Sequence, residues 1–299
     1  MEHQGHPRLI KRLLRACGLV AVFLALVWGI SFLVFAPPLE ASRTYPSGII
    51  LRDRTGAVIR VGLGPGDQDC RPFYKADRRD WVVQALVAAE DKRFWSHHGI
   101  DPLSILRAIR QNLSTGRRIS GASTITSQAV RLITPHPRTF FWKYAEAFQA
   151  MRMEGCLSKD EILEQYLNRA PLGSNLVGIE AGAMGWFGKP AKSLSLGEAA
   201  LLIGMVQSPT RFRPDRHLNA ALKRRTYVLD RMRALGLITP EQREGAESDS
   251  PVIRRAPRPF DYPFFADWAQ ATLTRTSGDF ITTLDPTLQN ATQTFIERR

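Results

Sequence analysis

The longest uninterrupted apolar run of the chain lies close to its start. Residues 16–36 read ACGLVAVFLALVWGISFLVFA and contain no charged side chain. About 20 consecutive apolar residues are enough for a helix to cross the hydrocarbon core of a bilayer. The pattern therefore predicts a transmembrane helix over residues 16–36, preceded by a short polar tail, residues 1–15.

Basic side chains in this tail set the expected orientation of the helix. There are four close to the apolar run, at Arg8, Lys11, Arg12 and Arg15. Positive charge stays on the cytoplasmic side, so the tail is expected inside and the rest of the chain outside. A cleaved signal peptide has the same layout. The run is long, however, and ends at Phe35 and Pro37, not at small residues, which favours an uncleaved signal anchor.

The next pattern is a short alternation typical of strands. Residues 47–63 form two apolar runs separated by Asp53-Arg54-Thr55-Gly56. Turn residues between two such runs predict a β-hairpin. We expect residues 37–66 to be a hairpin linker between the anchor and the main domain.

From Trp81 onward the apolar spacing is helical. Four apolar side chains share one stripe, at Leu103, Leu106, Ile109 and Leu113, while Arg107 and Arg110 fall on another side and Arg117 and Arg118 follow. This basic amphipathic helix could pack its stripe on the domain core. Alternatively, it could lie against anionic lipid headgroups.

Further helices follow, so the fold class is predicted to be mainly α. They are expected at 140–157, after the capping box Ser158/Glu161, after the capping pair Ser195/Glu198, and at 220–235. Glycines make residues 173–190 read as a looser stretch. The main domain is placed at residues 67–235. Residues 236–299 then hold a Pro- and Arg-rich linker (248–263), a strand (280–284) and a helix from Asp285.

Composition and charge narrow the classes of partner. A hydrophobic content of 44% indicates a folded globular chain, and a net charge of +13 calls for an anionic partner such as nucleic acid, lipid or a phosphate-bearing substrate. The cysteines Cys17, Cys70 and Cys156 have no metal-binding spacing. Free thiols are favoured over a disulfide between Cys70 and Cys156.

Residues 85–128 concentrate the candidate chemistry. An apolar helix leads into Glu90 and Asp91, an aromatic residue and two histidines follow, and the segment ends in hydroxyl side chains and Gln128. Partial burial beside an apolar helix suits a carboxyl group that transfers protons near neutral pH. A solvated acid at a helix end is the alternative for Glu90. His97 and His98 have no third ligand at recognisable spacing, so no metal site is expected.

Five short patterns occur in a fixed order along the chain. They are Glu90-Asp91-x-x-Phe94-x-x-His97-x-Gly99, the segment Gly121–Gln128, Lys143-x-x-Glu146, the segment Lys159–Asn168, and Arg224-Arg225-x-x-Val228-Leu229. Together they resemble the signatures of the glycosyltransferase family 51 domain, the peptidoglycan polymerase of class A penicillin-binding proteins. The resemblance implies a lysozyme-like, mainly helical domain.

The resemblance also implies a reaction. Lipid II would be the acceptor, and the growing glycan chain linked to undecaprenyl pyrophosphate would be the donor of an inverting transfer. By this resemblance Glu90 is the general base, and Glu146 assists departure of the pyrophosphate, directly or with a divalent cation (Mg²⁺ or Mn²⁺). No other cofactor is required.

The family's remaining site residues carry over position by position. Residues implied to bind or shape the substrate site are Asp91, Phe94, His97, Ser123, Thr124, Gln128, Arg131 and Lys143. Residues implied to support it are Gly99, Asn168 and Arg225. In addition, Trp142 stands where the family usually has Arg, and Ser127 where it has Gln. Replacement of Trp142 by Arg is therefore expected to raise activity or leave it unchanged.

The resemblance places the protein in the inner membrane as a single-pass protein, with a cytoplasmic N-terminus and a periplasmic catalytic domain. Its expected partners are lipid II, the glycan chain, the membrane and other cell-wall synthesis proteins; nucleic acid is excluded by the compartment. Residues 282–289 look like the opening of the family's transpeptidase domain, so the chain is expected to stop before that domain. A lysozyme-like hydrolase and a catalytically impaired scaffold are the alternatives.

Overall fold

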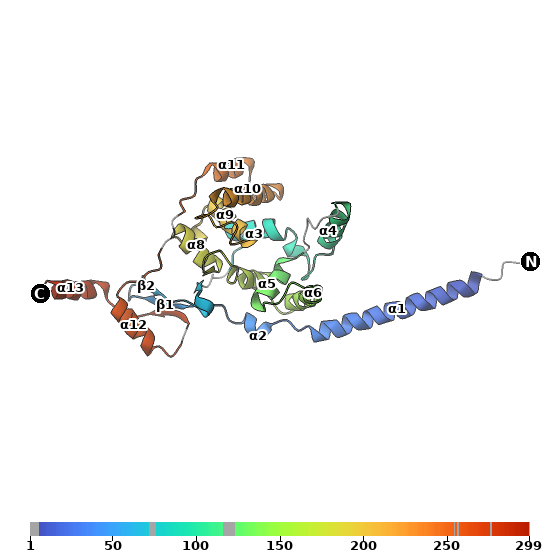
Figure 1. The fold of residues 1–299 in the computed structure, drawn as a ribbon, viewed down its shortest axis with the longest axis horizontal. Coiled ribbons are helices and arrows are strands. Elements are labelled where there is room, and N and C mark those ends of the chain that lie inside the picture. The colour runs from blue at the N-terminus through green and yellow to red at the C-terminus, as the bar shows by residue number, and fades with distance from the viewer. Residues whose placement is uncertain are drawn as a thin grey trace, which may run out of the picture.

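A computed structural model describes residues 6–71, 76–115, 123–253, 255, 257–275 and 277–298. Helices form a central body, with one long helix leaving it at one end and a small sheet at the other (Figure 1). The predicted mainly α class is confirmed. Four residues of the predicted segments, Arg117, Arg118, Gly121 and Ala122, lie outside the described residues.

The N-terminal apolar run forms the long helix α1 (His6–Val34). Its stretch Leu14–Val34 is long and apolar enough to cross a membrane. The helix begins earlier than residue 16 because the basic tail continues it. Its last turns pack on α6 (Phe140–Glu154): the rings of Trp28 and Phe148 lie 4.9 Å apart, and the Ser31 and Tyr144 hydroxyls are hydrogen-bonded at 2.8 Å. A short helix, α2 (Leu39–Ser42), follows.

The centre of the body is α9 (Leu196–Val206), which is buried from Gly197 to Met205. Its predicted capping box is confirmed, because the Ser195 hydroxyl accepts from the Glu198 N–H and the Glu198 carboxylate accepts from the Ser195 N–H. Helix α9 packs against α3 (Trp81–Glu90) and α10 (Leu218–Ala234). An apolar helix fixed on this core carries Glu90 at its last residue.

A second group of helices, α5 (Ile125–Ile133), α6 and α7 (Lys159–Leu167), packs beside this centre. Thr124 caps α5, Thr139 caps α6, and Ser158 forms the predicted capping box of α7. Each cap satisfies an N–H group that the first turn leaves without a partner. These caps fix where α5 and α6 begin and so the direction of their polar side chains.

The prediction of a loose stretch at 173–190 is wrong in part, because it contains the buried helix α8 (Ile179–Phe187). A Cβ atom on Gly182 would lie 2.3 Å from Cδ1 of Leu172, and one on Gly185 would lie 2.7 Å from Cδ1 of Leu176. The two glycines are therefore needed for close packing of this helix and do not mark a loop.

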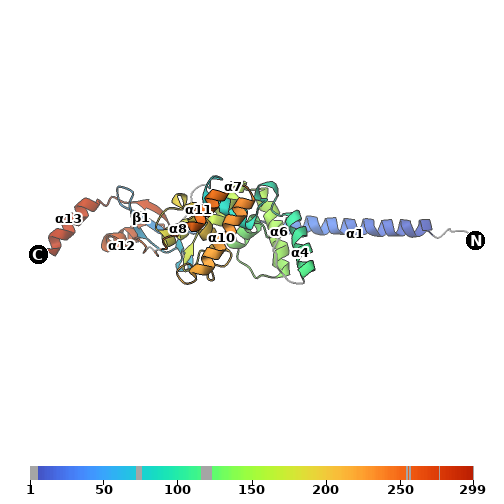
Figure 2. The same ribbon diagram turned by 90° about the horizontal axis from the view of Figure 1, so that it is seen from above.

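Helix α4 (Pro102–Thr115) turns its apolar stripe outward. Four side chains in this stripe are more than half exposed: Leu103 (65%), Leu106 (64%), Ile109 (51%) and Leu113 (79%). The alternative that this stripe packs on the core is therefore wrong. Both views place α4 at the end of the body from which α1 leaves (Figures 1 and 2).

The predicted hairpin is confirmed as β1 (Ile49–Arg52) and β2 (Val58–Val61), which pair antiparallel. A third strand, β5 (Gly278–Ile281), pairs parallel to β1, so the sheet order is β2-β1-β5. Helix α12 (Pro263–Thr272) packs on this sheet through Ala266 and Ala269. The hairpin and the C-terminal region thus share a small core of their own.

The remaining elements are short or peripheral. They are the strands β3 (Asp69–Cys70) and β4 (Leu176–Val177), the helices α11 (Pro240–Ser248) and α13 (Pro286–Glu297), and 3-10 turns at 65–67, 94–96 and 191–193. Strands β3 and β4 pair parallel. Helix α11 begins at a capping box formed by Thr239 and Gln242 and packs on α10.

The three cysteines are free thiols, as favoured from the sequence. Cys70 is buried, and this burial raises the pKa of its thiol to about 11, whereas Cys156 is exposed. A raised pKa keeps Cys70 in the unreactive thiol form at neutral and mildly alkaline pH. We expect iodoacetamide at pH 8 to modify Cys156 well before Cys70 in the folded protein, measured by peptide mass spectrometry. Equal rates in the folded protein, with urea-unfolded protein as the control, would contradict this placement.

Candidate active site

One cleft of about 1190 Å³ opens between the end of α3, α5, α6 and α10. Six of the residues predicted from the sequence line it: Glu90, Ser123, Gln128, Arg131, Lys143 and Glu146. They come from segments up to 56 positions apart, about a third of the length of the main domain. The fold therefore brings both predicted catalytic carboxylates to one cavity.

Glu90 lies on one side of this cleft. Its side chain is 16% exposed, and its Oε2 accepts a hydrogen bond from Nε2 of Gln128 at 3.1 Å. Nη2 of Arg224 lies 3.7 Å from Oε1. Behind them, burial and the charge of Glu90 raise the pKa of Tyr166, which keeps that phenol neutral. Glu90 is thus partly buried, held in orientation by an amide, and open to the cleft.

Glu146 is more deeply set, with a side chain only 3% exposed. Three nitrogen-bearing side chains surround its carboxylate. Nζ of Lys143 lies 2.9 Å from Oε2, while Nε2 of His136 and Nη1 of Arg131 lie 3.1 and 3.4 Å from Oε1. Lys143 also donates to Oγ of Ser123 at 2.9 Å. A buried carboxylate normally needs such partners to remain charged.

Basic side chains outnumber acidic ones in the cleft wall. The wall has two acids, Glu90 and Glu146, and seven bases: Lys92, Arg107, Arg131, Arg138, Lys143, Arg224 and Arg231. A concave surface of this charge attracts anionic groups and stabilises negative charge that develops within it. The cleft is therefore suited to a substrate that carries phosphate.

Four further predicted residues lie in the interior behind the cleft, namely Asp91, Phe94, His97 and Thr124. Asp91 is hydrogen-bonded to Nε2 of His97 at 2.8 Å and accepts from the Ile125 N–H at 3.0 Å. Phe94 is fully buried, and Oγ1 of Thr124 donates to the Gly99 carbonyl at 2.6 Å. These contacts tie the segment after α3 to the start of α5. Direct contact of the four residues with substrate stays a prediction.

The residues predicted to support the site make structural contacts. Gly99 has a φ of 88° and lies so close to α6 that a Cβ atom would be 2.5 Å from the Ala150 carbonyl carbon. Nδ2 of Asn168 donates to the Glu164 carbonyl at 2.9 Å. The buried Arg225 donates to the carbonyls of Asp249 and Glu247, which joins α10 to the end of α11.

Sequence reasoning gave no role at the site to several residues that the fold places there. Arg224, Tyr227 and Arg231 on α10 line the cleft, and His136, before α6, contacts Glu146 from outside the cleft wall. The spacing of 224, 227 and 231 is that of one helix face, and this signal could have pointed all three toward the site. Nothing comparable pointed to His136, because it lies in an irregular segment.

Among the described residues, no group of three or more His, Cys, Asp or Glu side chains is arranged to hold a metal ion. The two acids of the cleft are also held by hydrogen bonds and ion pairs to protein groups. A divalent cation in the reaction stays a prediction.

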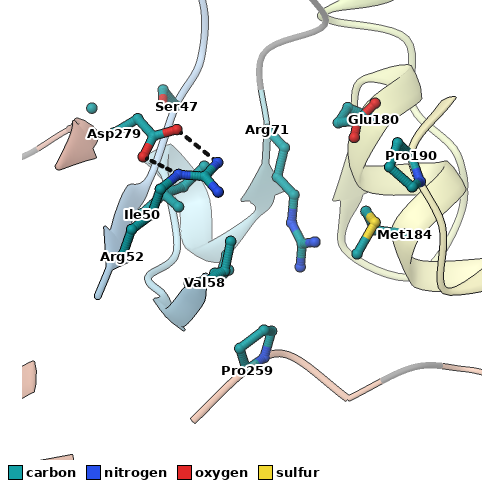
Figure 3. A pocket seen from close by; sticks show the side chains of 12 residues that line it. Ser47, Ile50, Arg52, Val58, Arg71, Glu180, Met184, Pro190, Pro259 and Asp279 are labelled. Carbon is teal, nitrogen blue, oxygen red and sulfur yellow. Dashed lines mark hydrogen bonds and ion pairs between the residues drawn. The ribbon is translucent and has the colours of Figure 1, made fainter. Parts of the chain in front are cut away.

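A second cavity, of about 430 Å³, lies between the small sheet and α8 (Figure 3). Its walls are mostly apolar, with Ile50, Val58 and Met184 among them. The charged side chains at its edge are already paired: Arg52 with Asp279 at 2.8 Å, and Arg71 with Asp69 at 3.0 Å. Burial raises the pKa of Glu180, whose carboxylate accepts from the Ala191 N–H. Both arginines that line this cavity have a carboxylate partner, whereas the larger cleft has seven basic side chains for two acids.

A mainly helical domain that presents two carboxylates in a basic cleft is suited to group transfer on a substrate that carries negative charge. The family model described as "Transglycosylase" matches residues 68–233, which is more than half of the chain. The chain belongs to the transglycosylase family.

Individual proteins to which this chain is similar include two penicillin-binding proteins. Penicillin-binding protein 1C of Escherichia coli is 44% identical over 210 residues, covering 69% of this chain and 27% of the relative. Penicillin-binding protein 1A of Pseudomonas aeruginosa is 33% identical over 302 residues, covering 95% of this chain and 36% of the relative. The chain thus spans about a quarter to a third of the length of these relatives. A solved structure of penicillin-binding protein 1A from Haemophilus influenzae superposes with a TM-score of 0.42 and 21% identity, covering 84% of this chain and 29% of that one.

Proposed function

We propose that this chain polymerises lipid II into glycan strands by inverting transfer from a donor linked to undecaprenyl pyrophosphate. The observation that carries the proposal is the placement of Glu90 and Glu146 in one basic cleft of a transglycosylase-family domain. An alternative, hydrolysis of preformed glycan, needs an acid like Glu90 but gives no reason for the basic wall.

In the proposed reaction Glu90 takes the proton from the acceptor's sugar hydroxyl as that oxygen attacks the donor's anomeric carbon. The bond between the anomeric carbon and the pyrophosphate oxygen breaks, and the pyrophosphate leaves with the electron pair. Arg131 and Lys143 would stabilise its growing negative charge, and Glu146 would hold these two cations in place. The amide of Gln128 orients Glu90 for proton transfer.

A substrate carried by a lipid requires the active cleft to face a membrane. Helix α1 supplies an apolar segment long enough to span one, and the exposed stripe of α4 lies at the same end of the body (Figure 1). Apolar side chains flanked by arginines suit insertion among anionic headgroups. This arrangement supports a single-pass inner-membrane protein with its N-terminus in the cytoplasm and its catalytic domain in the periplasm.

The direct test is polymerisation of purified lipid II by the detergent-solubilised protein, followed on gels as chain length increases. The assay is run with and without a chelator, because Mg²⁺ is commonly held by one or two carboxylates together with the phosphates of a substrate. Polymer that forms after chelation would show that no divalent cation is required, and loss of polymer with recovery by Mg²⁺ or Mn²⁺ would establish that one is. Cleavage of preformed glycan without any polymerisation would show that the chain is a hydrolase.

A further inference from the structure

His136 makes a contact with Glu146 that none of the five signatures includes. Its side chain is 5% exposed, and its Nε2 lies 3.1 Å from Oε1 of Glu146. On the other edge of the ring, Nδ1 lies 3.0 Å from the Thr134 carbonyl oxygen. His136 does not line the cleft itself, so any effect on the reaction must pass through Glu146.

The two nitrogens of the ring differ in their contacts. A carbonyl oxygen can only accept, so Nδ1 donates to the Thr134 carbonyl. Nε2 makes no well-aligned hydrogen bond in this structure, so its contact with Oε1 of Glu146 is one of distance. Such contacts at active sites commonly tighten when substrate binds.

Trp142 keeps the imidazole in this place. Its ring lies 4.8 Å from that of His136, and the planes are inclined by 51°. Trp142 is in the first turn of α6, four residues before Glu146, so both side chains project on the same side of the helix. An indole cannot supply the positive charge of the arginine usual in the family, but its ring can pack on the imidazole and hold it beside Glu146.

We propose that His136, held by Trp142, is a positioning residue that fixes Oε1 of Glu146. The inference rests on the proposed function for its kinetic consequence, but the contact of His136 with its two partners can be observed without any reaction. Arg131 and Lys143 are the charged groups that face Glu146, from α5 and from α6. They remain in place when His136 is changed.

Two matched substitutions separate the edge of the ring that faces Glu146 from the rest of the side chain. In His136→Gln the amide nitrogen can take the place of Nε2 and donate to Glu146; in His136→Asn it can take only the place of Nδ1. We expect kcat for lipid II polymerisation to fall about 10- to 100-fold in His136→Asn, as for loss of a hydrogen bond to a charged group, with KM changed less than about threefold. The kcat of His136→Gln should stay within about fivefold of that of the parent protein. Equal kcat values for the two variants would overturn the proposal.

Substitutions of Trp142 test the second half of the proposal. Trp142→Phe keeps an aromatic ring beside His136 and should retain activity, whereas Trp142→Ala should reproduce the loss of kcat seen in His136→Asn. The double variant should lose no more than either single one, because both act on the same contact. The ring contact also predicts that Trp142→Arg lowers activity, opposite to the expectation from family resemblance alone. Fully additive losses would show that the two side chains act separately.

A measurement without turnover keeps this proposal distinct from the proposed function. In protein labelled with ¹⁵N-histidine, the His136 ring signals, assigned by their loss in His136→Asn, should shift in Glu146→Gln and in Trp142→Ala, because both partners contact the ring. The exposed change Glu244→Gln should leave them in place. Unshifted His136 signals in both variants would overturn the proposal even if lipid II is polymerised, and shifted signals would support it even if polymerisation fails.

Discussion

Replacing Glu90 by Gln is expected to abolish lipid II polymerisation while leaving the protein folded. The amide can still hydrogen-bond to Gln128, because either of its polar atoms can face that side chain. It cannot accept the proton of the attacking hydroxyl. Loss of a general base lowers rates by about 100- to 10,000-fold. The measurement is the initial rate of polymerisation at saturating lipid II.

The matched control for this result is Glu244→Gln, an equivalent change on the exposed face of α11. It should leave both the rate and the melting temperature unchanged. Glu90→Gln should share that melting temperature, since Glu90 is partly exposed and its Oε1 is 3.7 Å from the nearest guanidinium nitrogen. Turnover within about threefold of the parent would remove Glu90 from the mechanism.

Replacing Gly99 by Ala is expected to destabilise the domain by about 3 kcal/mol. Two causes add at this position. A φ of 88° is strained for any residue with a Cβ atom, and that atom would lie 2.5 and 2.6 Å from the carbonyl carbon and oxygen of Ala150. The clash is with backbone, so no side chain can rotate away. Helix α6 carries Glu146 one turn earlier, so activity should fall with stability.

Gly56 offers a matched control for this substitution. Its φ is 91°, nearly the same as that of Gly99, but no heavy atom lies within 4 Å of a Cβ built on it. Gly56→Ala therefore isolates the backbone strain and should cost about 1 kcal/mol. Urea denaturation of both variants in the same detergent gives the difference. A similar loss for both would show that the close approach of Gly99 to α6 is unimportant for stability.

Local pattern alone was enough to predict many of the elements. The uncharged run before Pro37 predicted α1, and the turn after Arg52 predicted the β1–β2 hairpin. The serine caps at 158 and 195 marked the starts of α7 and α9. These features depend on neighbours a few residues apart, since a cap, a turn or a hydrophobic span is satisfied within its own segment.

Other features depended on contacts between distant segments. Glycines in residues 173–190 predicted looseness, but the approach of Leu172 and Leu176 makes two of them packing positions in α8. The stripe of α4 was compatible with a core or a membrane, and only its position showed that the core does not cover it. Strand β5 joins the hairpin from more than 200 residues away, which no local pattern could indicate.

The candidate active site also has a part that the sequence predicted and a part that only the fold decided. Glu90 and Glu146 could be named from the sequence because the short patterns that contain them resemble the signatures of a known family. Their meeting in one cleft depends on how α3, α5, α6 and α10 pack. His136 became visible only in three dimensions, because its partners Glu146 and Trp142 are brought to it by the fold. Sequence determined which groups were available, and tertiary packing decided which of them touch, because side-chain contacts depend on distances in space.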